Sequence, residues 1–552
     1  MTLSEPVIGR DFFGRDETLE LLKKRVNALT EGYRQNVALT GQNLAGKSSI
    51  LHHFLYNFHD NRILPIYVEI TDEPFLFFAQ RFTGSLIYNF LKSKGLEPGE
   101  EYEALIEEAR QFIPSTVKSV RDIHDMIRKR DLDSAYSLLF DLTSVVKSET
   151  GKSCVIILDE FHNLSSLNVK HPFRNFGKKI MIQKDTMYIV TSSRVATVKR
   201  ILNEKLSLLF GNFEVIQVNG FTIKNSSDFL DGRFRYMRIP PEIKNFIISL
   251  TEGNPFYLDA TSQALKDVVA SMTFKRVDQE ALIDALEKTL FNSKGCIFQY
   301  LSSSLQVLKQ RKPSDTYISI LLAVANGSYK LKEIAKSVKK RTGDVSKYMD
   351  DLSEMNILYK NGTFYKFVDK MFGFWLKFVY QRKRSAIISY LPDRIRIFRA
   401  EMKDLIGAFV REETKDILSR VAGIFGLFNS EAITLSEKEE KLPLFSSIDI
   451  KHFENGDPYI IAKTGKKAWI ASVSHNELKD LDIIDFAERC KIPRLALQKK
   501  ILIALSGIEM NAHLLAKEGK ISIWTIDTLN QLMAHYGKEL IVDFKYRRDA
   551  KR

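Results

Sequence analysis

The chain has 552 residues, of which 44% are hydrophobic and 27% charged, and its formal net charge is +14 at pH 7. This length exceeds what one hydrophobic core can organise and predicts three or four domains. No stretch of about 18 uncharged apolar residues occurs, and the first residues lack a signal-peptide pattern, so we expect no membrane span and a cytoplasmic location. The cysteines, Cys154, Cys296 and Cys490, stand far apart and exclude a disulfide framework or a zinc ribbon.

A loop of mostly small residues follows the first predicted strand. Residues 36–40 are apolar enough for a buried strand, and a helical stretch begins at Ser49. The order of strand, loop and helix is typical of a P-loop, which surrounds phosphate groups with backbone N–H donors at a helix N-terminus. The loop residues are Gly41, Gln42, Asn43, Leu44, Ala45, Gly46, Lys47 and Ser48.

The residue types in this loop suit phosphate chemistry. Gly41 and Gly46 allow the backbone to approach the phosphates closely, and Lys47 would reach the β- and γ-phosphates. The Ser48 hydroxyl would ligate Mg²⁺. An ordinary glycine turn is the alternative explanation, and the strand-loop-helix setting disfavours it. The loop, together with Ser49, therefore predicts a site for ATP and Mg²⁺.

The second half of this site is predicted further along the chain. After a strand at 63–70 and a long helical insertion, residues 154–160 form a buried parallel strand that ends in Asp159 and Glu160. Asp159 would hold Mg²⁺ through water, and Glu160 would polarise the attacking water as general base. Two terminal acids could instead cap the next helix, but the upstream P-loop favours a Walker B strand. We therefore expect ATP hydrolysis as well as binding.

Two further strands complete the predicted sheet. Residues 187–193 form a buried strand that ends in hydroxyl groups, and residues 213–218 form the fifth strand. Strands that alternate with helices predict a parallel α/β sheet with the nucleotide at the carboxyl ends of its strands. This P-loop core spans residues 1–222. Helical segments at 223–310 follow as a lid subdomain, with a turn at 251–258 between two of them.

Residues 311–403 predict a different kind of domain. Helices are expected at 314–325, 331–338 and 345–355, and a hairpin at 357–368 turns around an Asn-Gly pair. Three helices and a hairpin make a winged helix, whose third helix would enter a major groove. That helix carries four acidic residues against a single lysine, so its suitability for reading bases is poor.

The same segment holds most of the positive charge. Between Arg311 and Lys403 the chain has 20 Lys and Arg against 9 Asp and Glu, an excess of 11. The basic residues gather on the turn 339–341 and after the hairpin, between residues 370 and 399. They predict sequence-independent contact with nucleic-acid phosphates. A solvated basic face, or a surface that docks on the ATPase core, explains the same residues equally well.

The remaining residues, 404–552, alternate helices and strands again. A first helix holds Glu412 and Glu413 and precedes the first strand. The order of elements predicts an α/β domain with a central hairpin. Strands are expected at 447–450, 459–463, 468–473, 500–505 and 521–525, and helices at 480–490 and 512–518.

In their order, these motifs resemble the archaeal STAND-class ATPases, relatives of the AAA+ proteins. The resemblance covers approximately residues 8–400 and implies a P-loop NTPase sheet of the ASCE or AAA+ type. A nucleotide-dependent oligomer is compatible with this family. The shared features are the lead Phe12–Asp16, the P-loop, the Leu-Asp-Glu of the Walker B strand, the hydroxyl-tipped fourth strand, Gly253-Asn254-Pro255 and the winged helix.

The resemblance also assigns roles to single residues. It implies that Gly14 and Arg15 lie near the base or its ribose, and that Pro255 lies against the adenine. It makes Ser192 or Ser193 the sensor of the γ-phosphate, and we take Ser193 as the catalytic one. One departure concerns an arginine that many members carry before the last strand. This chain has Asn212 there, so Arg194 or Arg200 would have to substitute.

The tail looks like the nuclease-like domain of the restriction-endonuclease superfamily. Active members need an acid on one strand and an acid-x-Lys on a later one, because carboxylates hold Mg²⁺ and the lysine stabilises developing charge. Asp449 fits the first acid, but the later strand has Ser472-Val473-Ser474. Asp449-Ile450-Lys451 and Glu477-Leu478-Lys479 only imitate the spacing. We therefore expect this domain, 404–552, to be inactive as a nuclease.

These interpretations combine into one predicted function. The chain would be a STAND-type switch that binds and hydrolyses ATP with Mg²⁺ and acts on or near nucleic acid through the basic 311–403 segment. One alternative is a DNA-bound regulator in which the nucleotide only locks the fold. Another is a nuclease whose activity is gated by ATP.

Overall fold

The computed structural model describes residues 5–202, 213–272, 275–384, 390–436, 438–454, 456–491 and 496–542. The chain divides into two compact units. The first consists of Met1–Phe221, Asn254–Phe256 and Glu354–Asn356, and the second contains the rest. The partition into four domains that the sequence suggests stays a prediction. Asn212, whose role the family resemblance placed in doubt, lies outside the described residues.

A parallel five-stranded sheet forms the centre of the first unit. Every neighbouring pair in it is parallel, and the strand order is β2-β3-β4-β1-β5. The predicted parallel α/β sheet is therefore confirmed. The order places β4 between the P-loop strand β1 and the Walker B strand β3. The strands are β1 (Asn36–Thr40), β2 (Ile63–Glu69), β3 (Ser153–Asp159), β4 (Thr186–Ser192) and β5 (Phe213–Gln217).

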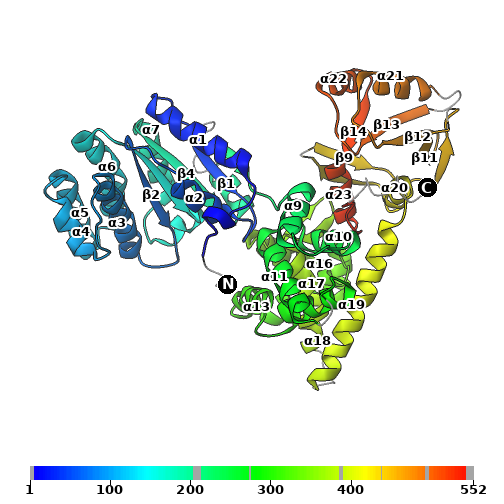
Figure 1. Ribbon diagram of the computed structural model, residues 1–552, viewed down its shortest axis with the longest axis horizontal. Helices are drawn as coiled ribbons and strands as arrows, with labels where there is room; N and C mark the ends of the chain where they lie inside the picture. Colours follow the sequence, from blue (N-terminus) through cyan, green and yellow to red (C-terminus); the bar gives the residue numbers. More distant parts are fainter. Residues whose placement is uncertain are drawn as a thin grey trace. The chain divides into compact units, whose positions relative to one another are not determined.

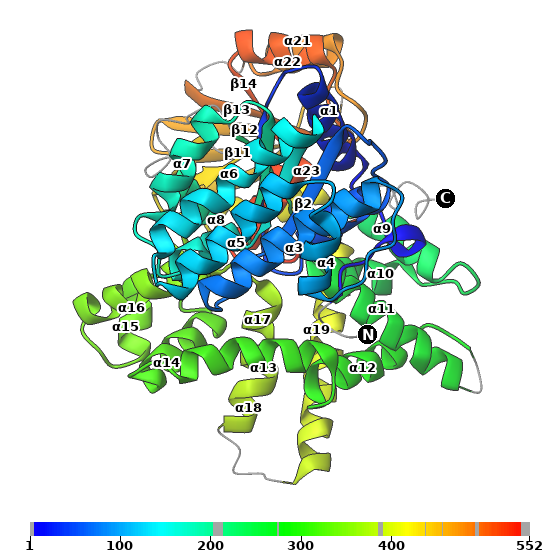
Figure 2. The ribbon, with the colours of Figure 1, turned by 90° about the vertical axis from the view of Figure 1, so that its left-hand side faces the viewer.

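Helices cover both faces of this sheet. Buried residues of α1 (Asp16–Thr30) and α2 (Lys47–Tyr56) pack on one face. The helical insertion covers the other face, and its four helices lie together in Figure 1 and again in Figure 2. The insertion and the helices after it are α3 (Phe75–Ser93), α4 (Tyr102–Ala109), α5 (Pro114–Arg128), α6 (Leu132–Thr150), η2 (Phe161–Ser166), α7 (Pro172–Ile182) and α8 (Val195–Arg200).

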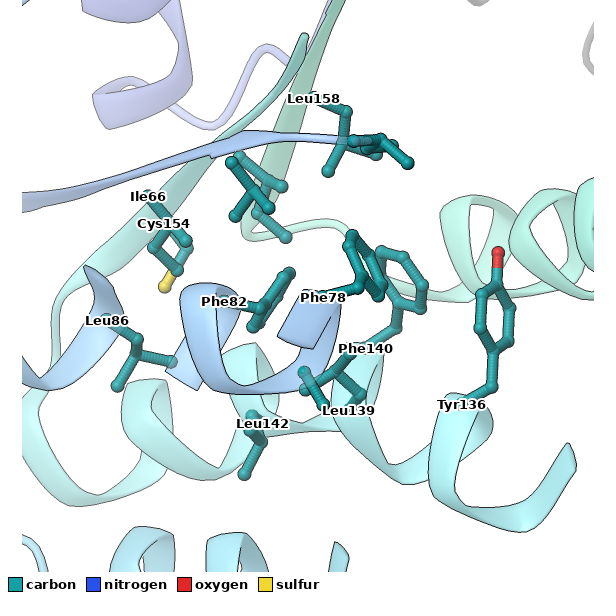
Figure 3. Packing of buried hydrophobic residues seen from close by; sticks show 14 of the residues in the cluster. Ile66, Phe78, Phe82, Leu86, Tyr136, Leu139, Phe140, Leu142, Cys154 and Leu158 are labelled. Carbon is teal, nitrogen blue, oxygen red and sulfur yellow. The ribbon is translucent and has the colours of Figure 1, made fainter. Parts of the chain in front are cut away.

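The larger core of this unit lies between the sheet and the insertion. Alternate residues of a strand point to opposite faces, so Cys154 and Leu158 of β3 face α3 while Val155 and Ile157 face α1 and α2. Aromatic side chains fill the space under the sheet. Figure 3 shows Phe78, Phe82 and Phe140 packed together beside Ile66 and Leu158. The Phe82 and Phe140 rings meet edge to face, with centroids 5.7 Å apart.

The second unit begins with a helical region and the predicted helices and hairpin. The predicted hairpin β6–β7 is antiparallel, and its turn is Gly362-Thr363, one residue later than a turn on Asn361-Gly362, because Asn361 pairs with Phe364. A long helix, α19 (Leu391–Glu413), leads into the last domain. The earlier elements are α9 (Ile223–Arg233), α10 (Pro241–Thr251), α11 (Pro255–Ser271), α12 (Gln279–Leu286), α13 (Cys296–Lys309), α14 (Ser314–Ala325), α15 (Leu331–Ser337), α16 (Thr342–Glu354), β6 (Leu358–Asn361), β7 (Phe364–Phe367), α17 (Lys370–Trp375) and α18 (Gln381–Arg384).

A second, mixed sheet organises the C-terminal part. Its order is β10-β11-β12-β13-β14, antiparallel over the first three strands and parallel afterwards. A further C-terminal α/β domain is thus confirmed, while the hairpin β8–β9 and the helix α23 were not predicted from sequence. The elements are α20 (Ile417–Phe425), β8 (Glu431–Leu435), β9 (Lys438–Leu442), β10 (Ser447–His452), β11 (Pro458–Thr464), β12 (Lys467–Ser474), α21 (Asp480–Arg489), β13 (Ala496–Ala504), α22 (Met510–Glu518), β14 (Ile521–Thr525) and α23 (Ile526–His535).

None of the helices in the described ranges combines the length and the apolar character that a membrane span needs.

The packing of the core under the first sheet predicts how much a truncated side chain lowers the free energy of unfolding. Phe82 is fully buried, whereas Phe77 on the same helix is 48% exposed. We expect Phe82→Ala to destabilise the first unit by about 3–5 kcal/mol, because it removes a buried ring and leaves a cavity. Phe77→Ala is the matched control and should cost well under half as much. Urea denaturation followed by circular dichroism measures both; equal midpoints would contradict the packing described here.

Candidate functional site

The backbone of the P-loop passes close to neighbouring strands. The Gly41 N–H donates to the Ser192 carbonyl of β4 at 3.2 Å. A Cβ atom on Gly41 would lie 2.1 Å from the carbonyl oxygen of Val218, so only glycine fits here. Gly46 has a φ of +93° and directly precedes α2. The loop is therefore held at the carboxyl edge of the sheet with the N-terminus of α2 facing it.

Lys47 lies within this loop and is only 4% exposed. Its Nζ donates to the carbonyl oxygens of Gly41, at 3.0 Å, and Gln42, at 2.9 Å. Burial lowers the pKa of Lys47, while the negative charges of Glu160 and Asp159 act in the opposite direction. The loop thus contains one buried cation that faces two carboxylates.

Asp159 at the end of β3 is 3% exposed and receives hydrogen bonds on both oxygens. Its Oδ2 accepts from Ser48 Oγ at 2.7 Å and from Tyr67 OH at 2.6 Å. Its Oδ1 accepts from Thr191 Oγ1 and from the Glu160 N–H, the latter at 3.1 Å. These donors fix the plane of the carboxylate next to the P-loop serine.

The strand order explains why these donors meet. In the sheet, β2 and β4 lie on the two sides of β3, so Tyr67 of β2 and Thr191 of β4 reach the same carboxylate from opposite sides. Burial, followed by the charge of Asp159, raises the pKa of Tyr67, so its hydroxyl stays a donor at neutral pH. Neither residue was predicted from the sequence as part of the site. Thr191 directly precedes the two serines that were predicted as sensors, but nothing in the local sequence singles out Tyr67.

Glu160 follows Asp159 in a left-handed conformation, with φ +53°. Its Oε2 accepts from the Ser193 N–H at 3.0 Å and from Ser193 Oγ at 2.9 Å, and it lies 3.2 Å from His162 Nδ1. Burial favours the neutral acid, but the bond from His162, the charge of Lys47 and the Ser193 N–H together lower the pKa of Glu160 to about 2. The carboxylate is therefore ionised at neutral pH.

The two serines named as candidate sensors have different neighbours. Ser193 contacts Glu160, as described above, whereas Ser192 is fully buried and its Oγ lies 2.9 Å from His162 Nδ1. Ser192 Oγ also accepts from the Arg194 N–H at 3.0 Å. His162 was missed because its spacing from Glu160 suggests only a helix residue. The catalytic role of Ser193 stays a prediction.

Arg15 connects the N-terminal segment Phe12–Asp16 to the P-loop by a hydrogen bond. Its guanidinium donates to the carbonyls of Ala45, at 3.0 Å, and Asn219, and lies 4.9 Å from the ring centroid of Phe221. Burial lowers its pKa to about 10. Gly14 precedes it with φ +66°. A contact of Gly14 and Arg15 with a base or ribose stays a prediction.

Ser49, and Asn254 beside Pro255, form hydrogen bonds with backbone groups. Ser49 Oγ accepts from the Val7 N–H at 3.1 Å, which ties the N-terminal segment to α2. Pro255 is the first residue of α11, and its neighbour Asn254 donates from Nδ2 to the Asn43 carbonyl at 3.4 Å. These hydrogen bonds do not test whether Ser49 and Pro255 contact the nucleotide, so both contacts stay predictions.

The donor set at Ser48 and Asp159 suits a hard cation. Both atoms are oxygens, they lie 2.7 Å apart, and the carboxylate is held by neutral hydroxyls that leave its charge in place. Mg²⁺ in phosphate sites uses one or two such protein oxygens with water and phosphate as its other ligands. Within the described residues no group of three or more His, Cys, Asp or Glu forms another metal site.

Asp449, the candidate nuclease acid, lies exposed on β10. The residue opposite it on the adjacent strand β11 is Ile461, and β12 with Ser472 and Ser474 lies one strand further away. Ser472 Oγ donates to the Pro458 carbonyl at 3.3 Å, and Ser474 Oγ to the Asn476 carbonyl at 3.1 Å. The residue opposite Asp449 is thus aliphatic, and the strand that carries Ser472 and Ser474 is not adjacent to β10.

Most of the basic residues after the hairpin have acidic partners. Arg399 contacts Asp284, Glu287 at 2.9 Å and Glu280 at 3.1 Å. Arg384 pairs with Asp315 at 3.1 Å, and Arg382 pairs with Glu401. The turn residues 339–341 are exposed and form no ion pair within the described chain. The expected basic surface is therefore much smaller than the charge count suggests.

Comparison with known proteins agrees with the P-loop geometry. Residues 11–178 match the family model described as "AAA ATPase domain". This part of the chain is therefore similar to an AAA ATPase domain. Such a domain implies ATP binding and nucleoside triphosphate hydrolysis, and the match includes Lys47, Asp159 and Glu160.

Several proteins resemble longer parts of the chain. "Uncharacterized protein MJECL04" of Methanocaldococcus jannaschii is 22% identical over 388 residues, which are 66% of this chain and 76% of that protein. The Walker-type ATPase PABY2304 of Pyrococcus abyssi has a TM-score of 0.45 at 20% identity, over 68% of this chain and 98% of that one. The ORC2 protein of Aeropyrum pernix also has a TM-score of 0.45, at 12% identity, over 72% and 97%.

The four hydrogen bonds to Asp159, from Ser48, Tyr67, Thr191 and the Glu160 N–H, form a clamp on its carboxylate. Removing one of these hydroxyls should have a specific effect. Tyr67→Phe keeps the ring but deletes the bond to Asp159 Oδ2, and bonds to charged groups are worth about 1.5–3 kcal/mol. We expect the apparent affinity for Mg²⁺ in nucleotide binding to fall about 10- to 100-fold. Substitutions of other groups that orient metal ligands have effects of this size. Titration of a fluorescent ATP analogue with and without Mg²⁺ measures this.

Tyr188→Phe is the matched control, because this buried tyrosine of β4 donates to Gln183 away from the site. It should leave the Mg²⁺ dependence unchanged. Identical Mg²⁺ titrations for Tyr67→Phe and the unmodified chain would contradict the role of the clamp.

Proposed function

We propose that the chain is a Mg²⁺-dependent ATPase of the STAND class that works as a nucleotide-driven switch. One observation supports this most directly: Lys47, Ser48, Asp159 and Glu160 meet at the carboxyl edge of β1 and β3 inside a domain of the AAA ATPase family. Each of the four suits one step of phosphoryl transfer to water.

The P-loop residues bind and orient the nucleotide in this proposal. The backbone N–H groups of residues 41–48 and the N-terminus of α2 face the phosphates, and Lys47 adds the positive charge. Ser48 and Asp159 would hold Mg²⁺, which neutralises charge on the phosphate oxygens. Tyr67 and Thr191 keep the Asp159 carboxylate in one orientation throughout.

Glu160 accepts the proton of the attacking water in this mechanism. Its carboxylate is ionised, but Oε2 is already bonded by the Ser193 N–H and hydroxyl and lies beside His162. Binding and activating a water therefore competes with these donors. We infer a slow basal turnover, which suits a switch better than a motor that hydrolyses continuously.

Nucleic acid is the partner that we propose for the second unit. The helices α14, α15 and α16 and the hairpin β6–β7 have the order of a winged helix. The exposed cations of residues 339–341 directly precede α16, whose own charges are mostly acidic. Contact would thus be made with phosphates and would depend little on sequence.

The two alternatives have less support. A regulator that binds ATP without hydrolysis would not need Glu160 to be held beside the P-loop lysine. An ATP-gated nuclease would need a second carboxylate near Asp449, and Ile461 occupies the opposite position on β11. We therefore propose that the C-terminal domain binds and does not cut.

Two substitutions test the ATPase assignment. Lys47→Ala should abolish ATP binding, because it removes the buried cation of the loop. Glu160→Gln should keep binding but lower turnover by about 10²–10⁴-fold, the usual contribution of a general base. Isothermal titration and a phosphate-release assay measure the two properties.

Glu214→Gln is the control for these variants, since Glu214 lies on the edge strand β5 opposite Val37, before the P-loop, and pairs with Arg25. Its ATPase activity should match that of the unmodified chain. Normal turnover in both Lys47→Ala and Glu160→Gln would overturn the proposal.

Salt dependence tests the nucleic-acid partner. Replacing Lys339, Lys340 and Arg341 with glutamine should weaken duplex binding and reduce the slope of log K against log salt by about 3, close to one for each lost phosphate contact. The same change at Arg382, Lys383 and Arg384 should have less effect, because two of these arginines pair with Glu401 and Asp315. Fluorescence anisotropy at several salt concentrations gives both slopes; an affinity independent of salt would contradict phosphate contact.

A further inference from the structure

One face of the hairpin β6–β7 contacts both Tyr329 of its own domain and the C-terminal domain. In the antiparallel register, Tyr359 pairs with Lys366 and Asn361 with Phe364, so these four side chains share one face. Leu358 and Phe367 lie on the opposite face, toward the helices. Phe364 and Lys366 are nevertheless only 8% exposed. Tyr329 and the C-terminal domain, which belongs to the same unit, cover them together.

The tip of the hairpin is bound to the edge of β8. Asn361 Nδ2 donates to the Thr434 carbonyl at 3.1 Å, and the Thr434 N–H donates to Asn361 Oδ1 at 2.7 Å. One side-chain amide thereby satisfies a donor and an acceptor of β8, as a neighbouring strand would. Gly362 has φ +60°, and a Cβ atom there would lie 2.2 Å from the Ala432 carbonyl oxygen. The contact therefore requires glycine.

Behind the tip, two lysines lie beside aromatic rings, Lys366 buried and Lys330 half-buried. Phe364 packs on His535 of α23, with ring centroids 4.4 Å apart. Lys330 Nζ lies 4.9 Å from the Phe364 centroid and 3.9 Å from Glu431 Oε2. Lys366 Nζ lies 3.0 Å from the Tyr329 centroid, and burial lowers its pKa to about 7. Burial, Lys366 and Lys330 together lower the pKa of His535 to about 4.

This contact is less well satisfied than the cores on either side of it. Glu431 Oε2 and His535 Nε2 are buried, and neither has a hydrogen-bond partner within the described chain. Lys366 forms no ion pair there. Groups of this kind lose hydration without full compensation, and polar contacts between domains are the ones that open most readily. A permanent interface between domains would instead be apolar, like the core around Phe425 and Trp469.

We propose that the covered face of the hairpin is a latent phosphate-binding surface for nucleic acid, and that the C-terminal domain and nucleic acid compete for it. The proposal rests on the nucleic-acid partner inferred above. In the covered state the exposed turn 339–341 remains available to phosphates, while Lys366 is buried and Lys330 is half-buried. Release of β8 and α23 uncovers Lys330 and Lys366, which then extend the basic surface along the hairpin. The C-terminal domain thus limits the affinity of the chain for duplex DNA.

Gly362→Ala in the full chain tests this directly. The added methyl group would clash with the Ala432 carbonyl and separate the hairpin from β8, which hydrogen exchange of β8 and α23 should report as faster exchange. Binding of a 30-base-pair duplex, measured by fluorescence anisotropy, should tighten about 10-fold, and the salt slope should steepen by about 2 for two added phosphate contacts. Gly343→Ala is the control, since nothing lies within 4 Å of a Cβ there.

A third variant assigns the gain to the two lysines. Adding Lys330→Gln and Lys366→Gln to Gly362→Ala should keep the fast exchange of β8 and remove the gain in affinity. If Gly362→Ala speeds exchange while DNA affinity stays at the value of the unmodified chain, the competition proposal is wrong and the partner assignment stands. If neither chain binds DNA although exchange is faster, the nucleic-acid partner itself is wrong. Tighter binding that persists without the lysines would also overturn the proposal.

Discussion

The carboxylate of Asp159 is the group on which the first unit depends. Four donors reach its two oxygens, from the P-loop helix, from both neighbouring strands and from the following backbone N–H. All four are neutral, so they orient the carboxylate without cancelling its charge, which a metal needs. The parallel order β2-β3-β4 is what brings them together. Any sheet order that separated β2 or β4 from β3 would leave the group buried and incompletely bonded.

The same geometry separates the tasks of the two adjacent acids. Asp159 lies between hydroxyls and is 3% exposed, whereas Glu160 turns away in a left-handed conformation toward Ser193 and His162. A left-handed residue other than glycine costs free energy, and here it directs the second carboxylate to the strand that ends beside the P-loop. Binding and hydrolysis can therefore be altered independently, because the two carboxylates have different partners.

The sequence predicted those parts of the site that are local in the chain. The P-loop and the Asp-Glu pair are contiguous patterns with a strand before them, and the five strands were found at nearly their observed bounds. Tyr67, Thr191 and His162 could not be found in this way, because their roles depend on which strands are neighbours in space. The hairpin β8–β9 was missed for a similar reason. Its strand Lys438–Leu442 is charged and exposed, so it lacks an apolar alternation.

The net charge of residues 311–403 overstates the basic surface that the chain exposes to a nucleic acid. A sum of charges treats every arginine as free, yet Arg399 alone contacts three carboxylates and Arg382 and Arg384 each contact one. Two more cations are withdrawn from solvent: Lys366 is buried beside Tyr329, and Lys330 is half-buried beside Glu431. The electrostatic field that a polyanion meets is set by the cations that remain uncovered, and it falls off within about one Debye length. How strongly this surface attracts a polyanion therefore depends on which of its cations are exposed as well as on how many the sequence contains.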